Sequence, residues 1–303
     1  MNDSTSQTIT FDPQANTFRA GNALLLAKVC NAAYLDDGPA REVATQLGLT
    51  NFKWIELTEH FSDLYGIAAS CDEFAVLAFR GTKDFKNWMT DLNATPAPFA
   101  WLFESGPDVG EVHGGFGHVL RDAWEKIATA LEAVAPLPAK TVDLTLLASP
   151  QRTLWITGHS LGGALAVLAG AAFSMWSGAS IRPVNGIYTF GQPRIGLYTF
   201  CGNYDHLLES KTFRFVNNQD LVPRVPFRGW DYADIGQMLH FTSDGTPQRQ
   251  SIQWSNFLAR TFESFKDFFS MAQNLSLDAG DHSMSGYQNL VGTQQTNLDK
   301  LFP

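Results

Sequence analysis

A serine that could act as a nucleophile stands in the segment GHSLG at positions 158–162, directly after a short apolar run. A stretch of small residues, 164–174, follows the segment. This order predicts a strand, a sharp turn and a helix, with Ser160 at the apex of the turn. Glycines suit such a turn because the serine backbone is strained and the helix passes close to the strand. The segment therefore predicts a nucleophile elbow, which we prefer to an ordinary glycine-rich turn.

A serine hydroxyl is a weak nucleophile at neutral pH, so Ser160 needs a histidine base and a carboxylate that orients the base. Both should follow the serine along the chain, the acid first. Of the three downstream histidines, His206 falls in a predicted helix and His240 precedes a strand-like stretch, so both have structural explanations. His282 lies in a polar, glycine-bearing loop, where a mobile imidazole is well placed. We therefore predict His282 as the base.

The predicted acid is Asp220, in the turn NNQD at 217–220, just after a predicted strand. A ligand site in a parallel sheet lies beyond this end of the strands. The alternative acid, Asp281, is next to His282 in sequence, and adjacent residues seldom face each other well. A turn aspartate that supports its own backbone also explains Asp220, so the turn alone leaves both interpretations open.

Attack on a carbonyl also requires two donors for the oxyanion that forms. The elbow supplies one donor, the backbone N–H of Leu161. Two segments compete for the second, FRGT at 79–82 and HGGF at 113–116. The second segment resembles an esterase motif, but it follows a loop rich in proline and glycine and leads directly into a helix. We therefore favour Thr82, which follows a predicted strand and offers both a backbone N–H and a hydroxyl.

The elements that must position these residues indicate an α/β protein. Apolar residues at three- and four-residue steps predict a long helix at 116–134. Strands and helices alternate after the N-terminal strands, which predicts parallel strands with crossover helices on both faces of the sheet. No repeat or linker divides the chain, so we predict one domain, 1–303. The other predicted helices are 23–34 and 197–208, and the strands are 52–57, 65–69, 74–79, 186–190 and 212–216.

The composition of the 303-residue chain excludes several classes of protein. With 45% hydrophobic and 17% charged residues, the chain is neither disordered nor fibrous. No apolar run reaches membrane-spanning length, so we expect no transmembrane anchor. The net charge of −9 argues against nucleic-acid binding and against electrostatic attraction to an anionic membrane. Any lipid contact should therefore be mainly hydrophobic.

Three cysteines, Cys30, Cys71 and Cys201, are odd in number and lack metal-ligand spacing, so we expect buried thiols and no metal site. The N-terminal residues 1–13 lack a basic segment followed by an apolar core, so no secretory signal is visible. We expect a cytoplasmic location by default, with signal-independent export or loss of a cleaved signal as alternatives.

Six blocks occur in order between 74 and 282, and their order and spacing are specific: AFRGTKDFKNWMTDL, VHGGF, WITGHSLGGALAVL, TFGQPRIG, VNNQDLVPRVP and DHS. Together they resemble the class 3 lipase family, the fungal-type triacylglycerol lipases and their bacterial and plant relatives. The resemblance implies the α/β-hydrolase fold. Secreted fungal members usually carry disulfides and a signal, which are not evident here, so the closer comparison is with bacterial or intracellular relatives.

The resemblance also assigns roles to individual residues. It implies a nucleophile, an acid, a base and two oxyanion donors, which are Ser160, Asp220, His282, Thr82 and Leu161. Asp91, nine positions beyond Thr82, stands where the family commonly has an aspartate that helps hold the oxyanion residue. The VHGGF block falls on a structural segment of the family, which weakens His113 as a donor. The segment after His282 matches only loosely, and Tyr287 receives no role.

Family lids occupy the place of residues 83–103, which include candidates for the lid or the acyl site: Phe85, Trp88, Met89, Leu92, Phe99 and Trp101. The first four fall at i, i+3, i+4 and i+7 and predict a short amphipathic helix. Such a stripe is also typical of ordinary core packing. We predict that 83–103 covers Ser160 in water and opens at a lipid surface.

An aromatic-rich helical insertion is predicted at about 252–272. Two interpretations of this segment stay open. It is either a core-facing helix, or a wall of the acyl site or docking surface for lipid aggregates.

These features predict a serine ester hydrolase with a water-insoluble acylglycerol as the favoured substrate. No metal or organic cofactor is needed for this chemistry. The alternatives are a phospholipase A1, an esterase of soluble aryl esters such as feruloyl esters, and a catalytically silent lipid-binding protein that kept the fold. We expect a monomer that meets a lipid–water interface transiently.

Overall fold

The computed structural model describes residues 10–57, 64–82, 95–102, 108–136, 152–175, 183–250 and 280–302, and the structural statements below concern these residues. The predicted lid segment, 83–103, overlaps them only at 95–102. The aromatic-rich segment predicted at 252–272 lies outside them.

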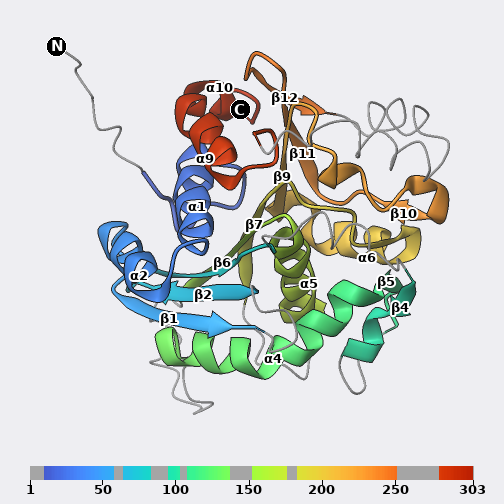
Figure 1. Cartoon of the computed structure of the whole chain (residues 1–303), viewed down its shortest axis with the longest axis horizontal. Helices are drawn as coiled ribbons and strands as arrows, with labels where there is room; N and C mark the ends of the chain where they lie inside the picture. The colour runs from blue at the N-terminus through green and yellow to red at the C-terminus, as the bar shows by residue number, and fades with distance from the viewer. Residues whose placement is uncertain are drawn as a thin grey trace.

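An eight-stranded sheet runs through the centre of the fold (Figure 1). In spatial order its strands are β1 (Asn51–Glu56), β2 (Tyr65–Ser70), β3 (Phe74–Phe79), β6 (Thr153–His159), β7 (Val184–Phe190), β9 (Thr212–Asn217), β11 (Gln237–Phe241) and β12 (Pro247–Gln250). The strands from β3 to β11 in this order run parallel to one another. Antiparallel strands flank them at both edges. The mostly parallel sheet confirms the prediction from the alternation of elements.

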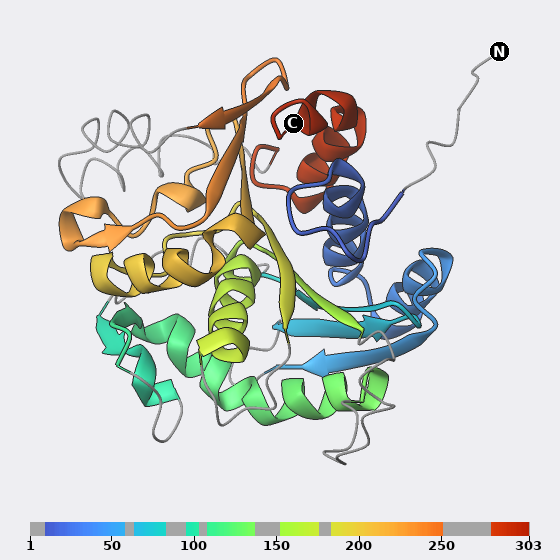
Figure 2. The ribbon, with the colours of Figure 1, turned by 180° about the vertical axis from the view of Figure 1, so that it is seen from behind.

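Helices cover both faces of the sheet, as seen from the two sides in Figure 1 and Figure 2. One face carries α1 (Ala20–Ala32), α2 (Asp37–Gln46), α9 (Met284–Thr293) and α10 (Gln295–Asp299). The other face carries α4 (Gly114–Val134), α5 (Leu161–Met175) and α6 (Tyr198–Leu208). The sheet therefore separates two hydrophobic cores.

The central strands are apolar without interruption because both of their faces are buried. Along β3, side chains alternate between the two cores. Ala75, Leu77 and Phe79 pack with α4 and α5. Their neighbours Phe74, Val76 and Ala78 pack with the helices of the opposite face. This two-sided burial explains why β3 reads as a continuous apolar run.

A second, four-stranded sheet lies beside α6 and joins short segments that are distant in sequence. Its strands, in order, are β10 (Tyr232–Ala233), β8 (Gly196–Leu197), β5 (Glu111–His113) and β4 (Pro96–Pro98). The residues before 113 were predicted to form a loop, and the structure shows β5 there instead. Strands of two or three residues are too short to show the alternation on which strand prediction depends.

The two ends of the described chain meet on one face of the sheet. Helix α1 packs along α9 and α10 (Figure 1). The backbone N–H of Ala20 donates to Oδ1 of Asp299 at 2.8 Å, and the rings of Phe18 and Phe302 stack with centroids 4.5 Å apart. Segments from both ends thus close the same core.

Several predicted boundaries shift in the structure. Helix α1 spans 20–32 instead of 23–34, so Tyr34 lies just beyond its end. His240 lies within β11 and not before a strand, because β11 pairs with β9 from residue 237 onwards. Cys30 and Cys201 are buried thiols, as predicted, whereas Cys71 is only half-buried. Short 3-10 helices also occur at η1 (Phe99–Leu102), η3 (Glu209–Lys211), η4 (Val222–Arg224) and η5 (Arg228–Trp230).

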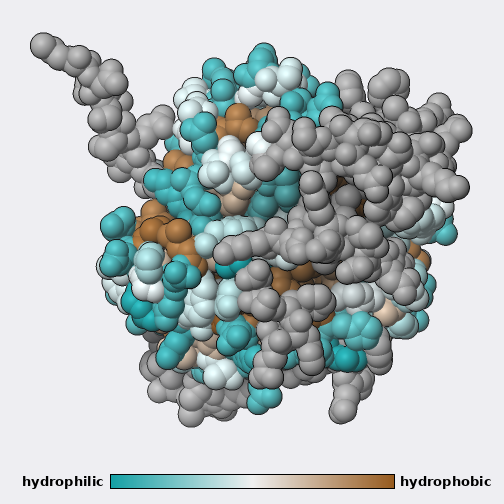
Figure 3. Space-filling view, viewed as in Figure 1, coloured by the Kyte–Doolittle hydropathy of each residue, from teal (hydrophilic) through white to brown (hydrophobic). Residues whose placement is uncertain are grey.

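The surface seen in Figure 3 carries apolar side chains in small patches separated by polar ones. Large apolar side chains that are exposed include Leu35, Tyr198 and Leu207. Isolated exposed apolar residues are ordinary on protein surfaces. Among the described helices, none combines the length and the apolar character that a membrane crossing requires.

Candidate active site

Ser160 lies in a sharp turn between β6 and α5. Its φ of 57° falls in the left-handed region, which costs energy for a residue other than glycine. Its backbone N–H donates to the carbonyl oxygen of Phe190 in β7 at 3.0 Å, and its own carbonyl oxygen accepts from Gly163 at 2.9 Å. The turn is therefore held by the neighbouring strand on one side and by the first turn of α5 on the other.

Two glycines of the elbow allow a close approach of backbone segments. A Cβ on Gly158 would lie 2.0 Å from the carbonyl oxygen of Gly162, and a Cβ on Gly162 would lie 2.2 Å from the carbonyl oxygen of Phe79. Real Cβ atoms do not approach other atoms so closely. The close passage of helix and strand predicted from these glycines is therefore confirmed.

Ser160, His282 and Asp220 come together at the carboxyl ends of the parallel strands. Nε2 of His282 lies 2.9 Å from Oγ of Ser160, and Nδ1 of His282 lies 2.8 Å from Oδ2 of Asp220. Asp220 follows β9, and His282 precedes Ser283, whose side chain caps the start of α9. A serine hydrogen-bonded to an imidazole that is hydrogen-bonded to a carboxylate is the arrangement that activates a serine as a nucleophile.

The carboxylate of Asp220 is fully buried and receives two donors besides the imidazole. Its Oδ1 accepts the backbone N–H of Val222 at 2.9 Å, and its Oδ2 accepts the hydroxyl of Tyr287 at 2.6 Å. Oη of Tyr287 in turn accepts the backbone N–H of Asn217 at 2.9 Å. Burial and the nearby Asp220 raise the pKa of Tyr287 well above its usual value, so it remains a neutral donor.

Tyr287 had no predicted role, and in the structure its hydroxyl donates to Asp220, the predicted acid. Its distance from Asp220 along the chain, 67 residues, explains the omission. Its signal in the sequence was that it is an aromatic residue five positions after His282.

Asp281, the alternative acid, binds the acid turn and not the imidazole. Its carbonyl oxygen accepts from Nδ2 of Asn217 at 3.0 Å. Its Oδ2 accepts from Nδ2 of Asn218 at 3.0 Å and from the backbone N–H of Gln219 at 3.3 Å. Asp281 thus joins the loop of His282 to the turn of Asp220.

The segment that carries Thr82 lies against the elbow. Phe79, the last residue of β3, pairs with Gly158 in β6. A Cβ on Gly81 would lie 2.8 Å from the carbonyl oxygen of His159 and 2.9 Å from Cβ of Ser160. Leu161, the first residue of α5, comes directly after the serine. Gly81, the residue before Thr82, therefore lies against the elbow, and Leu161 is the residue that follows Ser160.

His113, the competing oxyanion candidate, lies in β5 of the second sheet. Its ring is buried and stacks on Phe116 with centroids 4.1 Å apart. Burial lowers the pKa of His113 to about 4, so the ring is neutral at pH 7. The structure thus gives His113 a packing role, in agreement with the preference for Thr82.

The remaining site predictions fall mostly outside the described residues. This applies to the predicted oxyanion support, Asp91, and to the lid candidates Phe85, Trp88, Met89 and Leu92. The backbone of Trp101 lies in η1, and its side chain is outside the description. Phe99, also in η1, is an exception. It is 1% exposed and packs against Phe200, as a core residue does, and its place in a lid or acyl groove stays a prediction.

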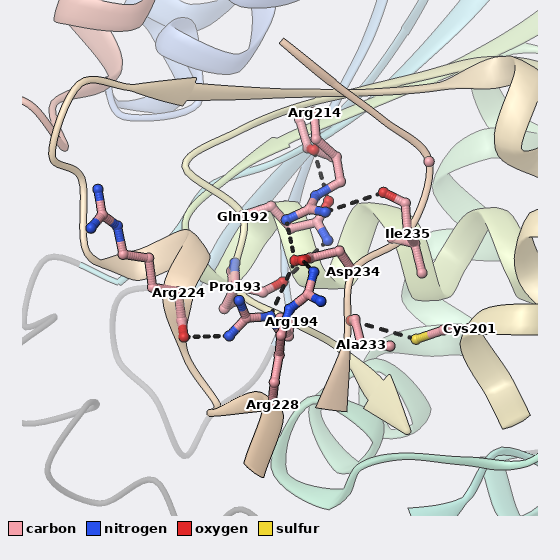
Figure 4. Close-up of polar contacts among 12 residues, drawn as sticks. Gln192, Pro193, Arg194, Cys201, Arg214, Arg224, Arg228, Ala233, Asp234 and Ile235 are labelled. Carbon is pink, nitrogen blue, oxygen red and sulfur yellow. Dashed lines mark hydrogen bonds and ion pairs between the residues drawn. The ribbon is translucent and has the colours of Figure 1, made fainter. Parts of the chain in front are cut away.

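Three arginines converge on Asp234 beside the segment that follows Asp220 (Figure 4). Oδ1 of Asp234 lies 3.1 Å from Nε of Arg194 and 3.3 Å from Nη2 of Arg214, and Oδ2 pairs with Arg228. Burial alone would raise the pKa of Asp234, but the three guanidinium groups together hold it well below its usual range. The carboxylate is therefore ionised at neutral pH.

Arg194 also ties the loop after β7 to the segment that follows the acid. Its Nη1 donates to the carbonyl oxygen of Pro226 at 2.8 Å and to that of Arg224 (Figure 4). Its backbone N–H donates to the carbonyl oxygen of Val225 at 2.8 Å. These contacts fix residues 224–226, which lie four to six residues after Asp220.

No cluster of three or more His, Cys, Asp or Glu side chains suited to a metal ion occurs within the described ranges. Within these ranges, the groups suited to chemistry at the site are the serine, the imidazole and the carboxylate. A mostly parallel sheet with an elbow serine, an acid and a histidine at its carboxyl edge defines the α/β-hydrolase fold.

The model of the lipase (class 3) family matches residues 76–230, more than half of the chain, and the chain belongs to this family. The chain is 31% identical over 209 residues to "Triacylglycerol lipase OBL1" of Ricinus communis. This alignment covers 55% of the chain and 38% of that relative. The chain is 33% identical over 151 residues to "Secreted mono- and diacylglycerol lipase 1" of Fusarium solani, with 50% and 39% covered. The match thus spans about two fifths of the length of each relative.

Among solved structures, lipase II from Rhizopus niveus is similar in fold. Its TM-score is 0.59 at 23% identity, over 87% of this chain and 92% of that one. The likeness confirms the predicted α/β-hydrolase fold. The family match confirms the predicted family and covers five of the six blocks, all except DHS at 281–283.

Proposed function

We propose that the protein is a serine ester hydrolase that acts on acylglycerols, with triacylglycerol as its main substrate class. The observation that carries the proposal is the hydrogen-bonded array of Ser160, His282 and Asp220, in a chain of the class 3 lipase family. The names of two relatives, one a triacylglycerol lipase and the other a mono- and diacylglycerol lipase, support the choice of substrate.

In the proposed reaction, Nε2 of His282 takes the proton from Ser160 as Oγ attacks the ester carbonyl. Asp220 holds the imidazole through Nδ1 and stabilises its charged form. Backbone N–H groups of Thr82 and Leu161, with the Thr82 hydroxyl, stabilise the oxyanion. His282 then gives its proton to the leaving alcohol as the ester C–O bond breaks, which leaves the acyl group on Ser160.

Water releases the acyl group by the same steps. His282 takes a proton from the water as its oxygen attacks the acyl-enzyme, and returns that proton to Oγ of Ser160 when the fatty acid leaves. The residues are thus restored, and the net reaction is hydrolysis of one ester bond.

Covalent labelling combined with a substrate panel tests the proposal. We expect a serine-directed phosphonate to label the wild-type protein at Ser160 and to leave Ser160→Ala unlabelled. We expect fatty acid release from a triacylglycerol emulsion, and rates with p-nitrophenyl esters that depend on acyl chain length. Folded wild-type protein that takes no label would contradict a serine hydrolase. Labelled protein that cleaves only phospholipid, or only soluble aryl esters, would replace the acylglycerol assignment with a phospholipase or an esterase.

A further inference from the structure

His159, the residue before Ser160, is a buried histidine whose two ring nitrogens both have partners. It is the last residue of β6. Its Nε2 lies 2.7 Å from the carbonyl oxygen of His282, and its Nδ1 lies 2.6 Å from Oη of Tyr34. One imidazole therefore connects the main chain of the proposed base to Tyr34, two residues after the end of helix α1.

The direction of each hydrogen bond follows from the chemistry of the partners. A carbonyl oxygen only accepts, so Nε2 of His159 carries a proton and donates to His282. Burial, together with the nearby His282, lowers the pKa of His159 well below its usual value, so the ring is neutral and Nδ1 accepts. The hydroxyl of Tyr34 then donates to Nδ1, and its oxygen is available as an acceptor.

The same hydroxyl also contacts the segment after β3 that carries Thr82. The backbone N–H of Gly81 donates to Oη of Tyr34 at 3.1 Å. A single chain of hydrogen bonds thus runs from Gly81 through Tyr34 and His159 to the main chain of His282. Its two ends lie beside the proposed oxyanion donor and on the proposed base.

We infer that Tyr34 and His159 are positioning residues, which fix the base and the oxyanion donor relative to each other. This inference rests on the proposed function, in which His282 moves the proton and Thr82 binds the oxyanion. Tyr34 and His159 act through main-chain atoms of Gly81 and His282. Alignment matters because a misplacement of roughly 1 Å costs on the order of a hundredfold in rate.

Tyr204, a buried tyrosine away from the site, provides a matched control. Oη of Tyr204 in α6 lies 2.8 Å from Oγ1 of Thr212, the first residue of β9. Ser160 and Asp220 lie at the carboxyl ends of the strands, so Tyr204 makes its contact at the opposite edge of the sheet. Tyr34→Phe and Tyr204→Phe each remove one buried hydroxyl, but only the first removes a contact with the site.

The experiment measures hydrolysis of p-nitrophenyl butyrate below its solubility limit, per active site titrated with a phosphonate. We expect Tyr34→Phe to lower kcat by about tenfold to a hundredfold with little change in KM, because alignment and not substrate binding is lost. We expect Tyr204→Phe to keep the wild-type kcat per titrated site. Thermal unfolding of both variants records any loss of stability separately.

Two substitutions of His159 test whether its hydrogen bonds, and not only its size, are needed for activity. A glutamine amide offers an acceptor oxygen and a donor nitrogen at a spacing close to that of the two ring nitrogens, whereas leucine offers neither. We expect His159→Gln to retain most of the wild-type kcat and His159→Leu to fall as far as Tyr34→Phe. If the two residues act as one hydrogen-bonded unit, the kcat of the double variant Tyr34→Phe/His159→Leu is no lower than that of the less active single variant.

The inference is overturned if both Tyr34→Phe and His159→Leu keep the wild-type kcat per titrated site. A smaller fraction of titratable molecules at that unchanged kcat would mean that the two residues have a purely structural role. If His159→Leu does not fold, Tyr34→Phe and His159→Gln decide the question. Wild-type protein that is not labelled at Ser160 would instead refute the proposed function, so the two failures are distinguishable.

Discussion

Tyr287 donates to the same oxygen of Asp220 that accepts from His282, so it helps to set the position of the acid. We expect Tyr287→Phe to lower kcat about tenfold, because a hydrogen bond to a charged group contributes roughly 1.5–3 kcal/mol. The variant also leaves the backbone N–H of Asn217 without its partner. Kinetics per titrated site, with Tyr204→Phe as the control, measure the effect. An unchanged kcat would mean that Val222 and His282 alone hold the carboxylate.

Gly81 has no space for a side chain between the elbow and Tyr34. A Cβ would lie 2.8 Å from the carbonyl oxygen of His159 and 3.0 Å from Oη of Tyr34. We expect Gly81→Ala to lower the free energy of unfolding by about 1–3 kcal/mol through overpacking, and to lower kcat because Thr82 moves with it.

Gly202 provides the control for this substitution. It lies exposed in α6, and a Cβ there would meet nothing within 4 Å. We expect Gly202→Ala to raise the free energy of unfolding by up to about 1 kcal/mol through helix propensity, with unchanged activity. Urea unfolding of both variants measures the difference. A Gly81→Ala variant that behaves like Gly202→Ala would show that the end of β3 can shift away from the elbow.

Between elements, Asp234 is the common partner of arginines from three different segments. Asp234→Asn would leave buried guanidinium groups without their counter-charge, and we expect it to cost about 3–5 kcal/mol of unfolding free energy at pH 7. The pKa of Asp234 is lower in the folded than in the unfolded state. Its charge therefore makes its full contribution to the free energy of unfolding when the pH is above the pKa of the unfolded state. It is lost as the pH falls below about 4.

The difference between wild type and Asp234→Asn should therefore shrink as the pH falls from 4 towards 2. Urea unfolding at pH 7 and at pH 3 measures it. Asp37→Asn is the control, since Asp37 forms an exposed ion pair with Arg41 at 3.1 Å and should change stability by less than about 1 kcal/mol. A difference that does not depend on pH would mean that the charge of Asp234 is not what holds the segment.

The sequence predicted best those elements whose signal is local. The elbow, β3, β7, β9 and α4 each carry their pattern within a few neighbouring residues. The strands of the second sheet escaped prediction because two or three residues show no period. Tyr34 and Tyr287 escaped it because their partners are 125 and 67 residues away, so that only the folded chain shows the contact.

At the scale of the whole molecule, the predicted lid at 83–103 and the predicted monomeric state remain to be tested. We expect the rate of ester hydrolysis to rise sharply as the substrate passes its solubility limit, because a lid that covers Ser160 in water opens on an apolar surface. Activity against ester concentration measures this, with Ser160→Ala as the blank. A smooth saturation curve through the limit would argue against a lid. Light scattering after size exclusion tests for a monomer.

The packing of α1 along α9 and α10 has a consequence for how the protein folds. Ala20 and Asp299 are 279 residues apart, and closing so long a loop is entropically costly and slow. The elbow forms from residues that are close in sequence, whereas Tyr34 and His282 reach it only when the two ends of the described chain have docked. During refolding, helical structure should therefore recover first, and hydrolytic activity should return only in the last kinetic phase.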